Sequence, residues 1–304
     1  MSLPAERGPQ QPRAVREVLQ ATLFPDYGQT KPSVGFLARA FIVATLPHSR
    51  PSGNEFTRRN GYYRLTLLAP TEIGLPYGRY PRLALAWMTT RAVKTKSPYL
   101  ELGPSFSKFA QSLGITPTTG PRGTLSGLRE QVHRLLSVSL SCHWDTTGAP
   151  NMADRGSKGH TGYNLCYQHQ LWWDHAKNEP SWFLLNTDFF NELATRPVPI
   201  DINVIQQLRA PLEIDLYTWL TWRSIRSSRI ARPELVPWND LHLQFGSDYA
   251  DLRVFKFKVL KHLKTVIRYY PSARLEPTPE GLKLLPYAPH VPRLFPGHNL
   301  PMKR

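Results

Sequence analysis

The chain is poor in cysteine, with only Cys142 and Cys166 among 304 residues and no CxxC spacing. A zinc site built on cysteines is therefore excluded, and so few thiols fit a reducing cytoplasm. The chain also lacks any apolar run near the roughly 18 residues that cross a bilayer, and residues 1–20 have no apolar signal core. We therefore expect a cytoplasmic protein that is neither secreted nor inserted in a membrane.

Motifs of catalysis are missing as well. No P-loop of the form GxxxxGK[ST] occurs, so ATP-driven melting of DNA by this chain is not expected. No two of the ten histidines are spaced i, i+2, whereas a nicking initiator of the rolling-circle type usually needs a His-apolar-His metal pair. Asp145, Asp154 and Asp174 are interpreted as polar loop residues. The sequence thus predicts a protein that is not an enzyme and has no cofactor and no metal site.

Acidic residues are too few to balance the basic ones. The chain has 22 Asp and Glu against 38 Lys and Arg, which gives a formal net charge of +16 and a pI near 10.0. Such an imbalance says little about fold, but it favours a polyanionic partner, with nucleic acid first and an anionic membrane second. The length and an apolar fraction of 41% predict two domains with cores of their own.

The first half of the chain has the pattern of a winged helix. Ser105 is a plausible N-cap and Gly114 a C-terminal glycine for a first helix, and a second helix with an apolar stripe follows after a Pro/Gly-rich linker. The polar stretch 52–61 is interpreted as a turn. The expected order is strands 34–44 and 62–69, helices 81–93, 105–113 and 124–136, strands 138–144 and 164–173 with wing loop 145–162 between them, a possible strand 182–185, and a short helix 188–194.

The same order of elements recurs after a Pro-punctuated junction at 196–201. The predicted elements are helix 211–227, an extended segment 233–237, helix 238–245 ended by Gly246, helix 248–270 and hairpin 273–285. We therefore predict an α+β fold with two tandem winged-helix domains. The expected parts are a flexible arm 1–33, a first winged helix 34–200, a second winged helix 201–292 and a basic tail 293–304.

The long helix at 248–270 is the clearest candidate for contact with DNA. At about 100° per residue, one side carries apolar residues and the other five cations. A solvated surface helix is the alternative interpretation. The apolar side holds Leu252, Phe255, Val259, Leu263, Val266 and Ile267, and the basic side holds Arg253, Lys256, Lys261, Lys264 and Arg268.

In a winged helix, the second helix of the helix-turn-helix lies in the major groove, with its N-terminal half at the base edges. For the first unit this places Arg122, Ser126 and Arg129 near bases, and His133 as a further contact. Arg129 could equally pair with a carboxylate such as Glu130, and His133 could be an ordinary surface residue. In the second unit, Arg253 and Lys256 come early enough to read bases, while Lys261, Lys264 and Arg268 suit phosphate.

Arg79 and Arg82 stand at the start of a predicted helix, where backbone N–H groups also favour phosphate. A structural turn is the alternative for this pair.

Several of these stretches resemble plasmid-encoded replication initiators of the RepA type, and GLPYGRYPR and WNDLHLQFG with the following DY are the most specific. The resemblance implies tandem winged helices that bind repeated origin sites (iterons), assist opening of AT-rich DNA, recruit the host replicative helicase and host initiator, and act in copy control. The matching stretches are Gly74–Val93, Leu100–Ser137, Phe189–Asp201, Leu212–Arg223, Trp238–Val266 and Glu280–Pro292.

Two questions stay open at the level of sequence. A winged-helix transcription regulator that represses its own gene fits the same pattern, and the nicking initiator is a less favoured rival. Related initiators often switch between dimer and monomer, so we expect a homodimer formed through the first domain. One of the adjacent Trp172 and Trp173 would face outward from a strand and is a candidate for such an interface.

Overall fold

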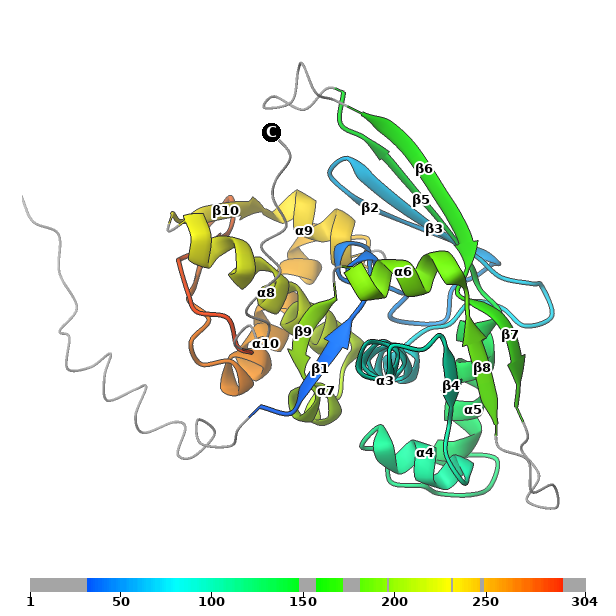
Figure 1. Ribbon diagram of the computed structural model, residues 1–304. Coiled ribbons are helices and arrows are strands. Elements are labelled where there is room, and N and C mark those ends of the chain that lie inside the picture. Colours follow the sequence, from blue (N-terminus) through cyan, green and yellow to red (C-terminus); the bar gives the residue numbers. More distant parts are fainter. Residues whose placement is uncertain are drawn as a thin grey trace, which may run out of the picture. The chain divides into compact units, whose positions relative to one another are not determined.

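The order helix, strand, helix, helix, hairpin occurs twice in the computed structural model (Figure 1). The structure describes residues 32–147, 157–171, 181–195, 197–230, 232–246 and 249–291. Most of the predicted arm 1–33, all of the tail 293–304, the centre of the loop 145–162, and Trp172 with Trp173 lie outside the described residues. Within the described ranges, no helix is long and apolar enough to cross a membrane.

The second unit has the complete winged-helix order. Its three-stranded antiparallel sheet has the order β10-β12-β11, so the two wing strands follow the helices and the early strand pairs with β12. Gly281 begins β12 at a close approach, since a Cβ there would lie 2.2 Å from the carbonyl oxygen of Val236. The elements are α8 (Pro211–Ile230), β10 (Glu234–Pro237), α9 (Trp238–Phe245), α10 (Leu252–Tyr269), β11 (Leu275–Pro277) and β12 (Gly281–Leu284).

The first unit repeats this arrangement, and its sheet order β4-β8-β7 corresponds to β10-β12-β11. Ser105 caps α4 as predicted, because its hydroxyl accepts a hydrogen bond from the backbone N–H of Lys108 at 3.2 Å. Gly114 follows that helix with φ +71°, a conformation that favours glycine. The elements are α3 (Arg79–Thr95), β4 (Tyr99–Glu101), α4 (Phe106–Ser112), α5 (Thr124–Leu136), β7 (Cys166–Gln170) and β8 (Trp182–Leu185).

The predicted wing of the first unit is wrong. Strand β5 (Ser139–Asp145) pairs with β6 (Lys158–Asn164), whose first residues fall in the predicted loop, and both belong to a separate sheet of order β2-β3-β5-β6. The wing is the β7–β8 hairpin instead. The predicted turn at 52–61 contains β2 (Glu55–Asn60), which pairs with β3 (Tyr63–Leu68). Strands β3 and β5 agree with the predicted strands 62–69 and 138–144, whereas β2 and β6 were not predicted, because one face of the sheet is polar and this dilutes the apolar pattern.

The apolar stretch 34–44 and the junction 196–201 also differ from expectation. The first is a strand β1 (Val34–Leu37) followed by a short helix α2 (Ala40–Val43), not one strand. The second contains β9 (Val198–Asp201), which pairs with β1 in an antiparallel ladder. This two-stranded sheet leaves one edge of β9 without a neighbouring strand, so Pro199 is tolerated there. Two further helices, α6 (Thr187–Thr195) and α7 (Ile202–Gln207), flank β9.

Buried side chains from both winged helices belong to one continuous hydrophobic cluster. Helix α8 lies within it, and Tyr217, Trp219 and Leu220 have no exposed surface. Contacts of α8 reach α10 in its own unit and both α2 and α3 in the preceding one. The second unit is therefore anchored by α8, which leaves the opposite side of α10 outside the core.

Candidate nucleic-acid interface

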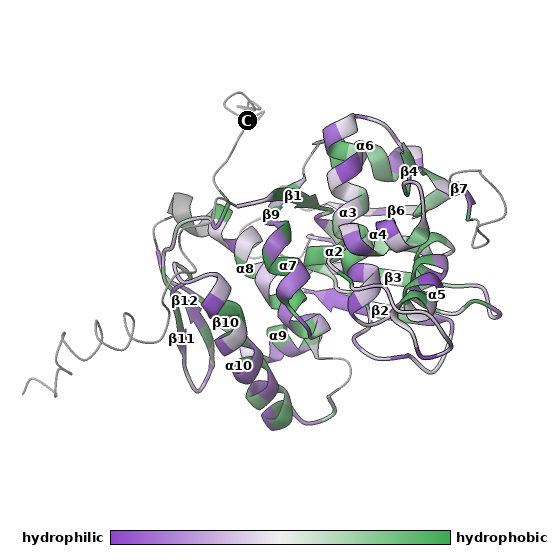
Figure 2. Ribbon diagram, turned by 90° about the horizontal axis from the view of Figure 1, so that it is seen from below, coloured by the Kyte–Doolittle hydropathy of each residue, from purple (hydrophilic) through white to green (hydrophobic). Residues whose placement is uncertain are grey.

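Helix α10 has the two faces that its sequence predicts. Asp251 caps the helix, because its carboxylate accepts a hydrogen bond from the backbone N–H of Arg253. The core side consists of Phe255, Val259, Leu263 and Val266, all buried. Four of the five predicted cations lie on the exposed side: Arg253, Lys261, Lys264 and Arg268. In Figure 2 the α10 ribbon accordingly carries both hydrophilic and hydrophobic segments.

Lys256 does not belong to this exposed face. Its ammonium group donates a hydrogen bond to the carbonyl oxygen of Pro279 at 3.3 Å and lies 5.4 Å from the centre of the Trp238 ring. Pro279 is in the turn between β11 and β12, so Lys256 connects α10 to the wing and to α9. These contacts give Lys256 a role in holding the wing, and its contact with bases stays a prediction.

Arg253 is the cation nearest the beginning of α10, and its side chain is 91% exposed. It pairs with Asp251 at 3.1 Å. An exposed ion pair of this kind contributes little to stability, because water screens the two charges. Arg253 is therefore able to exchange this partner for an external anion at small cost.

The exposed side of α10 also holds two large apolar residues that were not among the predicted contacts. Phe257 is 64% exposed and Val254 is 47% exposed. Phe257 lies at the rim of a groove of about 550 Å³ between α10 and the wing. On a helical wheel Phe257 falls between Arg253, Lys261 and Lys264, so the helical spacing already indicated that Phe257 lies on the cationic side.

Helix α5 of the first unit does not present a basic face. Its exposed residues include Ser126, Glu130 and His133, and the acidic one occupies the middle of the stripe. Arg129 is half-buried, with its guanidinium carbon 5.2 Å from the centre of the Phe106 ring. Arg122 is exposed in the segment just before the helix. The prediction of a second helix that is basic on its free side is therefore wrong.

Arg79 holds a neighbouring segment in place. Its guanidinium donates to the carbonyl oxygens of Leu208 at 2.8 Å and Gln206 at 2.6 Å. Burial, followed by the nearby charge of Arg209, lowers the pKa of Arg79. These bonds attach the start of α3 to the end of α7. The geometry therefore supports a structural role for Arg79 rather than a contact with phosphate.

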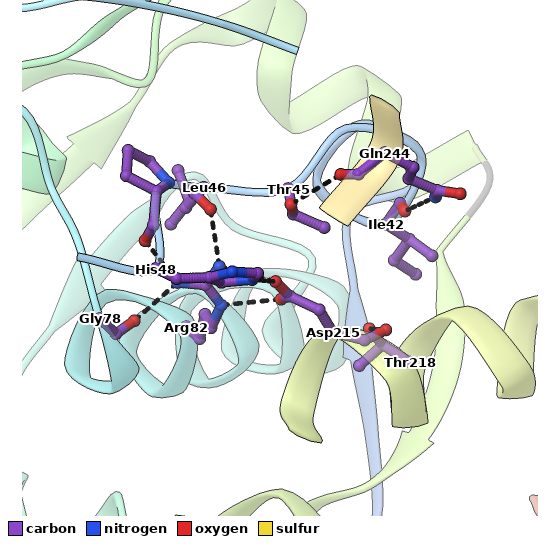
Figure 3. Close-up of polar contacts among 10 residues, drawn as sticks. Ile42, Thr45, Leu46, His48, Gly78, Arg82, Asp215, Thr218 and Gln244 are labelled. Carbon is purple, nitrogen blue, oxygen red and sulfur yellow. Dashed lines mark hydrogen bonds and ion pairs between the residues drawn. The ribbon is translucent and has the colours of Figure 1, made fainter. Parts of the chain in front are cut away.

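Arg82 lies in the interior, with 5% of its surface exposed. Its guanidinium makes two hydrogen bonds of 2.7 Å to the two carboxylate oxygens of Asp215 on α8. It also donates to the backbone carbonyl oxygens of Leu46, Pro47 and Gly78. Figure 3 shows these bonds converging from three segments. The prediction that Arg82 contacts phosphate is wrong, because every bond it makes is internal.

His48 completes this buried cluster. Its Nε2 lies 2.7 Å from the second carboxylate oxygen of Asp215, and its side chain is 7% exposed. Burial lowers the pKa of His48, so we treat this contact as a hydrogen bond from a neutral imidazole rather than an ion pair. Burial alone would raise the pKa of Asp215, but the Arg82 guanidinium and the His48 hydrogen bond hold it below its usual range.

A second polar contact between the units lies beside this cluster (Figure 3). The side-chain amide of Gln244, at the end of α9, donates to the carbonyl oxygens of Ile42 at 3.0 Å and Val43 at 3.2 Å. The hydroxyl of Thr45 donates to the backbone carbonyl of Gln244. The second unit is thus bonded at both α8 and α9 to residues of the first.

Residues 75–239, more than half of the chain, match the family described as plasmid encoded RepA protein. The chain belongs to the plasmid-encoded RepA family. The crystal structure of selenomethionine derivatives of domain 2 and domain 3 of RctB is similar to this RepA-family protein, with a TM-score of 0.51 and 13% identity over 82% of this chain and 96% of that one. This likeness concerns the fold, and it agrees with the α+β, winged-helix arrangement.

A further crystal structure of RctB domains 2-3 gives a TM-score of 0.46 and 15% identity, over 80% of this chain and 93% of that one. No curated protein sequence matches the chain. In the part of this RepA-family protein that the structure describes, no group of three or more His, Cys, Asp or Glu side chains is placed to hold a metal ion.

Buried and half-buried histidines make the stability of this RepA-family protein depend on pH. Burial lowers the pKa of His48, His169 and His290, so the folded chain binds fewer protons than the unfolded chain below pH 6.5. The free energy of unfolding should therefore be highest above pH 6.5 and should decrease as the pH drops below that value. The slope is limited to about 1.4 kcal/mol per pH unit for each histidine that is protonated only on unfolding.

Urea unfolding at pH 7.5, 6.5 and 5.5 measures this effect. His48→Gln is the matched variant, because a glutamine amide can still donate to Asp215 but does not titrate. The variant should show a weaker dependence on pH than the parent chain. Equal stability of the parent at pH 7.5 and 5.5 would contradict the account.

Proposed function

We propose that this protein is a sequence-specific initiator of plasmid replication that binds repeated duplex sites at the origin through α10. The observation that carries the proposal is the exposed cationic face of α10, where Arg253, Lys261, Lys264 and Arg268 stand opposite the buried face. This helix is the second of its helix-turn-helix, which is the one that enters the major groove in proteins of this class.

The roles of the four cations follow from their positions along α10. Arg253 is the second residue of the helix, where side chains reach base edges, and arginine can donate two bonds to guanine. Lys261, Lys264 and Arg268 lie in the second half of the helix and are proposed as phosphate contacts. The wing hairpin, held to α10 through Lys256, would pass beside the DNA backbone.

The first unit has a smaller part in the proposal. Arg122, Ser126 and His133 are exposed at or before α5 and stay candidates for contact with DNA, and Arg129 would have to leave Phe106 to reach a base. Origin opening, the host helicase and host initiator as partners, iteron binding, copy control and a homodimer rest on the family alone. The absence of catalysis and a cytoplasmic location likewise remain predictions.

A replication assay tests the initiator role against that of a plain autorepressor. The gene and its flanking DNA are placed on a plasmid that has no other origin, and transformants are counted in a suitable host. We expect the plasmid to replicate, and we expect the K261A/K264A double variant to fail. If the intact gene supports no replication while its product still binds the flanking repeats, the regulator is the better account.

A further inference from the structure

Two apolar side chains interrupt the cationic face of α10. Phe257 is 64% exposed and Val254 is 47% exposed, although the same helix buries Phe255 completely. The two residues are three apart and so share one side of the helix. Lys261 and Lys264 follow Phe257 by four and seven residues on the same side, and Arg253 precedes it by four. Cations thus flank an apolar patch along the same side of α10.

The charge around this patch narrows the kind of partner that can cover it. Exposing a phenyl ring to water is unfavourable, so a bound partner gains by covering it. The surrounding cations favour a polyanionic partner. In duplex DNA the base edges of the major groove carry one apolar group, the C5-methyl of thymine, and phenylalanine is among the side chains that contact it.

We propose that Phe257, together with Val254, contacts thymine methyl groups in the major groove and so determines part of the sequence specificity. This inference rests on the proposed function, since it requires α10 to lie in the groove. Three residues of α-helix rise about 4.5 Å, and base pairs are about 3.4 Å apart. The two side chains are therefore close enough together to reach base pairs that are adjacent or nearly so.

The groove beside Phe257 offers a competing partner, a peptide or a second protein. Its apolar walls come from α10 and the wing, and include Leu260, Ile267 and Leu275. The charged residues among its lining are Lys261 and Lys264, with no carboxylate. A peptide or protein would need acidic side chains near Lys261 and Lys264, whereas DNA supplies negative charge through its phosphates. This difference favours DNA as the partner that covers Phe257.

Deoxyuridine scanning tests the inference with the full-length chain. The bound duplex is first located by footprinting, and each thymine in it is then replaced singly by deoxyuridine, which pairs identically and lacks only the methyl group. Replacement at one or two positions should weaken binding about fourfold each, the value of one buried methyl-sized group. Replacement elsewhere should leave the affinity unchanged.

The Phe257→Ala variant supplies the second arm of this experiment. It should bind the thymine duplex more weakly than the parent chain and should no longer distinguish thymine from deoxyuridine at the sensitive position. Because Phe257 is exposed, its thermal unfolding should be unaltered. Leu68→Ala, which removes an apolar residue of 46% exposure on β3, is the matched control and should keep both affinity and methyl dependence.

The possible failures are distinguishable. If the parent chain binds no duplex from the flanking DNA, both the proposed function and this inference fall. If it binds specifically but every deoxyuridine duplex binds alike, or if Phe257→Ala keeps the methyl dependence, only the inference is overturned. If Phe257→Ala alters sedimentation without altering DNA affinity, the patch is a protein contact and the inference is again overturned.

Discussion

Replacing Asp215 with alanine is expected to lower the free energy of unfolding by about 3–5 kcal/mol, the usual cost of removing one partner from a buried ion pair. Asp215 accepts two hydrogen bonds from Arg82 and one from His48, and it is 5% exposed. Without the carboxylate, the Arg82 guanidinium would keep only its backbone acceptors and would be buried without a counter-charge. Urea unfolding followed by tryptophan fluorescence measures the change.

The control for this prediction removes both charges together. An Arg82→Met and Asp215→Leu double variant replaces the pair by apolar side chains, so no buried charge is left unpaired. It should therefore be less destabilised than Asp215→Ala alone, and a double-mutant cycle with the single variants Arg82→Met and Asp215→Leu gives the coupling energy. If Asp215→Ala costs under about 1 kcal/mol, within the range of a surface pair, Arg82 is not held by Asp215 as the structure indicates.

The double replacement K261A/K264A should weaken binding to duplex DNA about 60-fold at 0.1 M salt. The binding constant varies with the salt concentration raised to a power of about −0.9 for each phosphate contact, and the variant loses two such contacts. Both side chains are exposed, whereas Phe255, Val259, Leu263 and Val266 form the buried side of α10. The loss should be similar on specific and unrelated duplexes, since phosphates carry no sequence information. Fluorescence anisotropy with labelled duplexes measures both affinities.

A charge-matched control separates contact from net charge. Arg91 and Lys94 are exposed on α3, the first helix of the other unit, and R91A/K94A removes the same two charges. This variant should lose much less affinity. Equal losses for the two double variants would mean that total charge, and not the face of α10, determines binding.

Local signals explain what could be predicted from the sequence. Helix α5 begins at Thr124 and ends at Leu136 as expected, and Ser105 caps α4. The two faces of α10 follow from its 3.6-residue period. Caps, glycines and helical periodicity act over a few residues, so they can be recognised without knowing what the helix packs against.

Long-range partners explain what could not be predicted from the sequence. Arg82 looked like a phosphate contact because it stands at a helix start, but its partner Asp215 is 133 residues away. Strand β9 was hidden in a Pro-rich junction because its partner β1 lies near the other end of the first unit. The polar strand β6 is defined by pairing with β5 rather than by its own pattern. The half-burial of Arg129 could not be predicted either, because the Phe106 ring beside it belongs to a different helix.

The central claim is that the exposed face of α10 binds the DNA backbone, and the salt dependence of binding tests it most directly. For the parent chain, neutralisation of about eight phosphates predicts that log K falls with log salt at a slope near −7. For K261A/K264A, two fewer contacts predict a slope of about −5. An unchanged slope for the double variant would show that Lys261 and Lys264 do not touch phosphate, and would contradict the account.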